Sequence, residues 1–181
     1  MLMAQDKTLH KYDDKELKTL LSSIVVLVDS REKENRHILE GLDSRHIQYQ
    51  TQGLNYGDYS FMLPMNIELG IVRDMYFNNQ IVIERKGSLE ELSSNLATYR
   101  DRFEAELLRC RGKMILMIEG SSYQDIFYHS YNTKLSEKAF FTSLMSFKAR
   151  YDIDIEFVDS QFSWYYIYNV FYYYLRNYLK G

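Results

Sequence analysis

Short apolar stretches alternate with amphipathic segments along the 181-residue chain. Stretches of about five residues rich in Val, Ile, Leu and Met, or with strict alternation, are typical of strands. Segments in which apolar residues recur every three or four positions indicate helices. The predicted strands cover residues 24–28, 46–51, 59–63, 80–85, 114–118 and 153–158. The predicted helices cover residues 13–23, 34–42, 98–111, 136–150 and 162–179, and two more begin near Ser88 and Ser121.

Strands that alternate with helices predict an α/β domain, with a mixed central β-sheet flanked by α-helices on both faces. We expect residues 1–23 to form an N-terminal extension with a short helix. Residues 24–181 are expected to form one domain that closes with an aromatic helix. Residues 65–79 read as a loop or hairpin, and Gly41, near the end of the helix at 34–42, is expected to help terminate that helix.

Composition agrees with a folded domain, since 46% of the residues are hydrophobic and 26% are charged. The formal charge of −3 gives no general basic signature, so nucleic-acid binding would need local patches. The single cysteine, Cys110, excludes an internal disulfide and suits a reducing compartment. The first 23 residues lack the apolar core of a signal peptide. The expectation is a cytoplasmic or nucleoid-associated protein with no membrane contact.

Acidic residues stand at the ends of three predicted strands. Asp29 follows the first strand, Asp58 precedes the third, and Glu84 lies near the end of the fourth. Strand alternation places Glu84 and Lys86 on one face and Arg85 on the other. Carboxylates that bind Mg²⁺ or Mn²⁺ beside a lysine can hydrolyse phosphodiesters. The spacing alone is weak evidence, because strands commonly end in charged residues at the solvent.

The three motifs taken together are more specific. They are Val28-Asp29-Ser30-Arg31-Glu32, Gly57-Asp58-Tyr59 and Ile83-Glu84-Arg85-Lys86. In this order they resemble the nuclease domain of the XPF family and its archaeal relative Hef, whose core is similar to that of restriction enzymes. The resemblance extends over about residues 24–158 and implies a restriction-endonuclease-like core.

The resemblance implies roles for individual residues. Asp29, Asp58 and Glu84 would be metal ligands, and Lys86 would be the catalytic lysine. The residues that would complete the catalytic site are Arg31, Glu32 and Arg85. Glu90 stands where the family has an aspartate, and the serine before it favours a helix-capping role instead.

The implied activity is that of a Mg²⁺- or Mn²⁺-dependent DNA endonuclease. Its expected substrate is branched or flapped DNA in repair, recombination or mobile-element replication. The helix-hairpin-helix modules that usually follow this domain in the family have no match in the sequence, so a separate DNA-binding partner is among the expected partners. The alternatives are a non-catalytic DNA-binding or scaffold subunit with the same fold, and a restriction-like nuclease with another target.

Two further features bear on partners. The residues expected to contact DNA are Arg100, Arg102, Lys134 and Lys138, although interleaved acids would also suit an ordinary solvated helix. The helix at 162–179 is aromatic nearly all round, which indicates burial on more than one side. Because the resembling family dimerises through helices beside its nuclease sheet, we expect this helix to form part of a homodimer interface.

Overall fold

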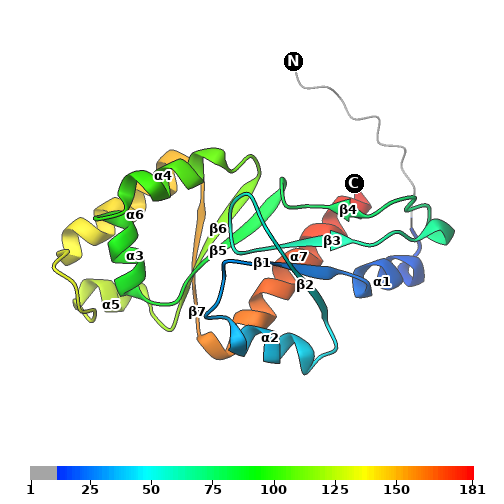
Figure 1. Ribbon diagram of the computed structural model, residues 1–181, viewed down its shortest axis with the longest axis horizontal. Helices are drawn as coiled ribbons and strands as arrows, with labels where there is room; N and C mark the ends of the chain where they lie inside the picture. Colours follow the sequence, from blue (N-terminus) through cyan, green and yellow to red (C-terminus); the bar gives the residue numbers. More distant parts are fainter. Residues whose placement is uncertain (1–11) are drawn as a thin grey trace, which may run out of the picture.

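A seven-stranded mixed β-sheet forms the centre of the computed structural model, which describes residues 12–181 (Figure 1). The strands are β1 (Val25–Asp29), β2 (Gln48–Gln52), β3 (Tyr59–Leu63), β4 (Met75–Tyr76), β5 (Ile81–Lys86), β6 (Lys113–Glu119) and β7 (Asp154–Val158). Their order is β2-β1-β3-β5-β6-β7, with β4 paired to β3. β3 is antiparallel to β1, β4 and β5, whereas the β1–β2, β5–β6 and β6–β7 pairs are parallel. The predicted mixed sheet is therefore confirmed.

Helices cover both faces of the sheet, as expected (Figure 1). One layer contains α1 (Asp14–Ser22), α2 (Arg36–Asp43) and α7 (Ser163–Lys180). The other contains α3 (Leu89–Leu96), α4 (Arg100–Arg109), α5 (Tyr123–Phe127) and α6 (Glu137–Tyr151). Short 3-10 turns occur at Ile67–Leu69 and Ser160–Phe162. Within residues 12–181, no helix combines the length and the apolar character needed to cross a membrane.

The alternation of side chains along β5 divides the core in two. Ile81 and Ile83 face the core under α1, α2 and α7, whereas Val82 faces the core under α3, α4 and α6. α7 contributes a buried stripe of Ile167, Phe171 and Leu175 to the first core. The aromatic helix is thus first of all a core element, because this stripe recurs every four residues.

Helix α1 packs into the same core as α7. Asp13 caps it by accepting hydrogen bonds from the backbone N–H groups of Lys15 and Glu16, at 2.8 Å each. Its buried face consists of Leu17, Leu20 and Leu21. The helix expected near residues 13–23 is confirmed. Residues 1–11 of the predicted extension lie outside the described residues, and the boundary at residue 24 stays a prediction.

Gly41 does not end its helix. It lies inside α2, where an added Cβ would come within 2.2 Å of Trp164 Cγ. The helix continues to Asp43. The expectation that Gly41 is a terminating residue was wrong, because the glycine serves the close approach of α2 to Trp164 at the start of α7.

Candidate active site

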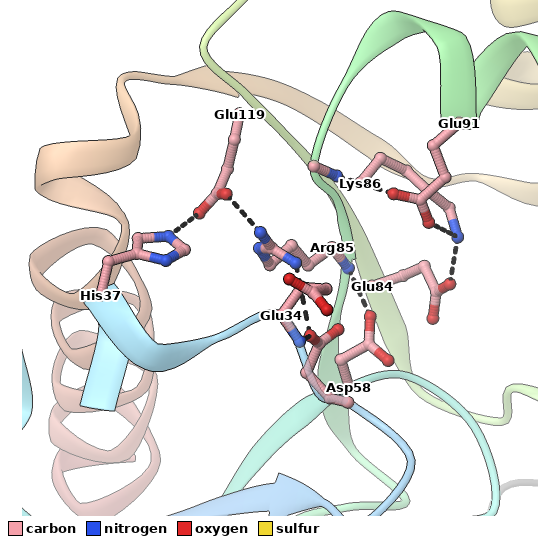
Figure 2. A network of polar contacts seen from close by, with 10 residues as sticks. Glu34, His37, Asp58, Glu84, Arg85, Lys86, Glu91 and Glu119 are labelled. Atoms are coloured by element: carbon pink, nitrogen blue, oxygen red, sulfur yellow. Dashed lines mark hydrogen bonds and ion pairs between the residues drawn. The ribbon is translucent and has the colours of Figure 1, made fainter. Parts of the chain in front are cut away.

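The end of β5 sends neighbouring charged side chains to opposite faces of the sheet. Glu84 and Lys86 point to the face covered by α3 and α4, and Arg85 points to the other (Figure 2). Lys86 Nζ lies 2.6 Å from Glu84 Oε1 and 3.5 Å from Glu91 Oε1. The ammonium also lies 5.2 Å from the ring centroid of Phe103. The predicted sharing of one face by Glu84 and Lys86 is confirmed.

Two hydrogen bonds to the backbone of β5 hold Asp58 in place. Its N–H donates to Ile83 O at 2.9 Å, and its Oδ2 accepts a hydrogen bond from the backbone N–H of Arg85 at 2.8 Å. Gly57 precedes it with φ of +70°, a conformation that favours glycine. A Cβ at Gly57 would lie 2.8 Å from Val82 Cβ. The Gly-Asp pair is therefore required for the Asp58 carboxylate to reach the end of β5.

Asp58, Glu84 and Lys86 meet in a pocket of about 350 Å³. The pocket lies between the strand ends and the helices α3 and α4. Its lining residues are Arg31, Asp58, Glu84, Lys86, Glu91, Asn95, Tyr99, Arg102, Phe103 and Glu106. The structure therefore brings together two of the three predicted metal ligands, the predicted catalytic lysine and two of the predicted arginines.

Burial shapes the charge state of this pocket. Desolvation raises the pKa of Asp58 well above its usual range, and the nearby Glu84 carboxylate adds to the effect. Desolvation also raises the pKa of Glu84 to about 7, against the opposing attraction of Lys86. Burial would lower the pKa of Lys86, but the carboxylates of Glu84, Glu91 and Asp58 together outweigh it, so the net shift is upward. One lysine therefore faces two carboxylates that burial disfavours as anions.

These residues fit a divalent cation. Glu84 Oε2 is buried and has no hydrogen-bond partner within residues 12–181. A cation between Asp58 and Glu84 would satisfy that oxygen and offset the desolvation of both carboxylates. Mg²⁺ is commonly held by one or two carboxylates and completes its shell with waters and phosphate oxygens. In the described part of the chain, no group of three or more His, Cys, Asp or Glu side chains is arranged to hold a metal, so the site would rest on two carboxylates.

Asp29 lies beside the pocket and is held there by hydrogen bonds from Arg31 and Leu54. Its Oδ1 accepts hydrogen bonds from Arg31 N at 2.7 Å and Arg31 Nε at 2.8 Å. Its Oδ2 accepts from Leu54 N at 2.7 Å and Arg31 Nη2 at 3.0 Å. Burial would raise the pKa of Asp29, but the Arg31 and Leu54 hydrogen bonds hold it below its usual value. Asp29 does not line the pocket, and its role as a metal ligand stays a prediction that this bonding does not favour.

Arg85 and Glu32 lie behind the pocket and do not line it. Arg85 Nη1 is 3.4 Å from Glu32 Oε1, and Arg85 Nη2 is 2.7 Å from Glu119 Oε2. Glu119 Oε1 in turn lies 2.9 Å from His37 Nε2 (Figure 2). Burial would raise the pKa of Glu119, but the hydrogen bonds from Arg85, Ser163 and His37 and the charge of Arg85 together outweigh it, so the pKa is lowered. Arg85 contacts the carboxylate of the expected metal ligand Asp58, and it does so through its backbone N–H, which donates to Asp58 Oδ2.

The neighbouring residues Glu90 and Glu91 at the start of α3 have different contacts. Ser88 caps α3 by accepting a hydrogen bond from the backbone N–H of Glu91. Glu91 accepts from the backbone N–H of Gly87 at 2.9 Å and faces the pocket. Glu90 instead accepts from Asn132 N at 2.8 Å and does not line the pocket. Glu90 therefore anchors the segment before α6, and of these two glutamates it is Glu91 that approaches Lys86, at 3.5 Å.

Sequence reasoning missed several residues of the site. Asn95, Tyr99, Phe103 and Glu106 line the pocket from α3 and α4. Asn95 lies on α3, whereas Tyr99, Phe103 and Glu106 follow one another at intervals of three or four residues at the start of α4 and along it. Nothing in the sequence indicates that these residues cover the strand ends. Glu119 was missed as well, although it closes a predicted strand as Asp29 does.

The four basic residues expected to contact DNA are dispersed. Arg102 is exposed and lines the pocket. Arg100, two positions earlier on α4, instead pairs with Glu104 at 2.9 Å and lies 5.0 Å from the ring centroid of Phe147. Lys134 and Lys138 are exposed on the segment at the start of α6 and do not line the pocket. Of these four residues, only Arg102 lines the pocket that contains Asp58 and Glu84.

Comparison with known proteins gives one family and one fold. XPF from Aeropyrum pernix, alone and in complex with DNA, matches with a TM-score of 0.60 and 18% identity over 84% of this chain. The present chain spans only 65% and 66% of the length of those two chains. At that identity the likeness establishes the shared fold. No curated protein sequence matches the chain. The model of the ERCC4 domain matches residues 28–170, and the chain therefore belongs to the ERCC4 domain family.

Proposed function

We propose that this protein is a metal-dependent DNA endonuclease that hydrolyses phosphodiester bonds. The observation that carries the proposal is the convergence of Asp58, Glu84 and Lys86 in one pocket, with a buried Glu84 oxygen that lacks a partner within residues 12–181. A module that only binds DNA has no need to bury two carboxylates against one lysine. Membership of the ERCC4 domain family and the fold shared with XPF support the same reading.

The pocket residues have distinct roles in this proposal. Asp58 and Glu84 would hold Mg²⁺ or Mn²⁺, which supplies Lewis acidity and an activated water when bound. Lys86, held at 2.6 Å from Glu84, places a fixed positive charge where negative charge develops on the phosphate. The Arg31 side chain is 66% exposed beside the pocket, and its guanidinium can bind a phosphate by charge attraction and by donating hydrogen bonds.

The test is cleavage of labelled flap, fork and linear duplex DNA in Mg²⁺ or Mn²⁺. We expect the wild-type protein to cut at least one of them and Asp58→Asn to lose activity, because the variant removes one of the two proposed ligands. Glu156→Gln is the control, since Glu156 is an exposed acid on β7 outside the pocket. Activity that survives in Asp58→Asn and in Glu84→Gln would refute the proposed site.

The comparison of substrates also decides between the finer alternatives. We propose branched or flapped DNA as the substrate, in keeping with the motif resemblance. Preferential cutting of linear duplex would instead favour a restriction-like enzyme with another target. Binding of DNA without cleavage of any substrate in either metal would favour the scaffold subunit.

Self-association through α7 is a further part of the proposal. The inward stripe of α7 belongs to the core, but Tyr165 and Tyr173 on its outward face are each 56% exposed. Exposed aromatic side chains of this kind are enriched at protein interfaces. Light scattering at micromolar concentration should give the mass of a dimer, and Tyr165→Glu should reduce it. A monomeric wild-type mass would exclude the homodimer.

A further inference from the structure

A second cluster of buried charges lies behind the pocket and consists of Glu32, Arg85, Glu119 and His37. We propose that Glu119 is a positioning residue, which fixes Arg85 so that the Arg85 backbone N–H holds the Asp58 carboxylate in place. None of the four lines the pocket, so the cluster acts through the strand end and not on the substrate. The inference rests on the proposed function only for its activity measurement.

Glu119 has the geometry of a fixed anchor. It is 4% exposed, and its two oxygens bind different partners, Arg85 Nη2 at 2.7 Å and His37 Nε2 at 2.9 Å. It ends β6, which runs parallel to β5 with Lys86 opposite Ile118. The anchor therefore lies on the strand adjacent to the one it holds, one residue beyond the last pair.

Arg85 depends on that anchor. Its side chain is 8% exposed, and its other acidic contact is the 3.4 Å approach of Nη1 to Glu32. Arg85 Nε is buried with no hydrogen-bond partner in the described part of the chain. A guanidinium that cannot reach water must be paired where it lies, and removal of its main partner leaves a buried charge with only the longer contact to Glu32. Arg85 would then move toward solvent and take the end of β5 with it.

The backbone of Arg85 transmits this displacement to the pocket. Its N–H donates to Asp58 Oδ2 at 2.8 Å, a hydrogen bond that sets the orientation of the carboxylate. The adjacent residues Glu84 and Lys86 occupy the same strand end. A shift of Arg85 therefore alters the relative placement of all three pocket groups, while the surface that would contact DNA is unchanged.

His37 completes the arrangement from α2. It is 36% exposed and contacts Glu119 Oε1, whereas Arg85 contacts Oε2. Removal of the imidazole leaves the Arg85 contact in place but frees one side of the anchor. We therefore expect His37→Ala to have the same kind of effect as Glu119→Gln and a smaller one.

The test measures backbone amide exchange and the kinetics of DNA cleavage in Glu119→Gln and in the wild-type protein. Backbone hydrogen exchange by NMR should be faster at Arg85 than in the wild-type protein, by more than any change at Val82 and Ile83 of the same strand. The kcat for DNA cleavage should fall by about 10–100-fold, the range typical of groups that orient metal ligands, with KM for DNA retained. The exchange measurement needs no activity, so it decides the inference even if the wild-type protein cuts no DNA.

Two further variants serve as a control and as a substitute for Glu119→Gln. Glu40→Gln on α2 is the matched control, because Glu40 is an exposed carboxylate of the same helix that carries His37. It should leave both measurements at wild-type values. If Glu119→Gln does not fold, His37→Ala is measured in its place. Exchange at Arg85 that changes no more than at Val82, or a wild-type kcat in a folded variant, would overturn the positioning role.

Discussion

Lys86 Nζ lies 2.6 Å from Glu84 Oε1, while Glu84 Oε2, on the same carboxylate, is buried without a partner within residues 12–181. The lysine thus satisfies one oxygen of a glutamate that lines the same pocket as Asp58, and it leaves the other oxygen unpaired among the described residues. Two carboxylates and one ammonium leave an excess of negative charge when all are ionised. This half-paired arrangement suits the binding of a divalent cation and a phosphate together.

Replacement of Lys86 by methionine should abolish most of the activity. The side chain keeps a similar length but loses the charge proposed to stabilise the phosphate, so kcat should fall about 10²–10³-fold. Single-turnover cleavage measures the effect. Lys18→Met is the control, because Lys18 is exposed on α1 and lies outside the pocket. Equal rates in the two variants would remove Lys86 from the reaction.

Asp29→Asn should act on stability. Asparagine keeps one acceptor oxygen and loses the other, so the donors of Arg31 or Leu54 lose a partner at a cost of about 1–3 kcal/mol. The pKa of Asp29 is lowered from 3.8, so its carboxylate stabilises the fold above that pH and the gain is lost as the pH falls through the folded-state pKa. Urea unfolding should therefore separate the two proteins at neutral pH and less so below pH 3.8.

The same variant separates the structural role of Asp29 from ligation. Calorimetric titration of DNA-free protein with Mn²⁺ should give wild-type affinity for folded Asp29→Asn and a weaker one for Asp58→Asn. A loss of Mn²⁺ affinity in Asp29→Asn as large as in Asp58→Asn would restore Asp29 to the ligand set.

Arg102 and Arg100 provide a matched pair on one helix. Arg102 lines the pocket, whereas Arg100 is paired with Glu104 and packed on Phe147. Arg102→Ala should weaken DNA binding and lower the slope of log affinity against log salt by about one. Arg100→Ala should leave that slope unchanged. Fluorescence anisotropy over a salt series is the measurement, and equal slopes for both variants would contradict the assignment.

Gly41→Ala tests the contact between α2 and α7. At an ordinary helix position this change would stabilise by about 0.5–1 kcal/mol. Here the new Cβ would lie 2.2 Å from Trp164 Cγ, so we expect a loss of about 1–3 kcal/mol from overpacking. Gly53→Ala is the control, since a Cβ there meets nothing within 4 Å. Thermal unfolding of the two variants should shift in different directions or by clearly different amounts.

Most of the fold could be predicted because the spacing of apolar residues along the chain indicates each helix and strand locally. The strand Tyr59–Leu63 occurs where the sequence predicts it, and α1, α6 and α7 begin or end within two residues of expectation. Gly41 shows where local reasoning fails. A glycine near a helix end suggests termination, but here a tryptophan more than a hundred residues later explains it.

The sequence by itself determined the chemistry of the site. The Gly-Asp turn, the alternation of Glu84, Arg85 and Lys86, and the order of the motifs are local and can be read without coordinates. The tertiary structure decided which of these charges meet. It tied Asp29 to Arg31, moved Glu90 away from Lys86, and placed Arg85 against Glu119 behind the strand. The physical reason is that a buried charge must find a partner in space, and that partner lies on whichever strand or helix packs beside it.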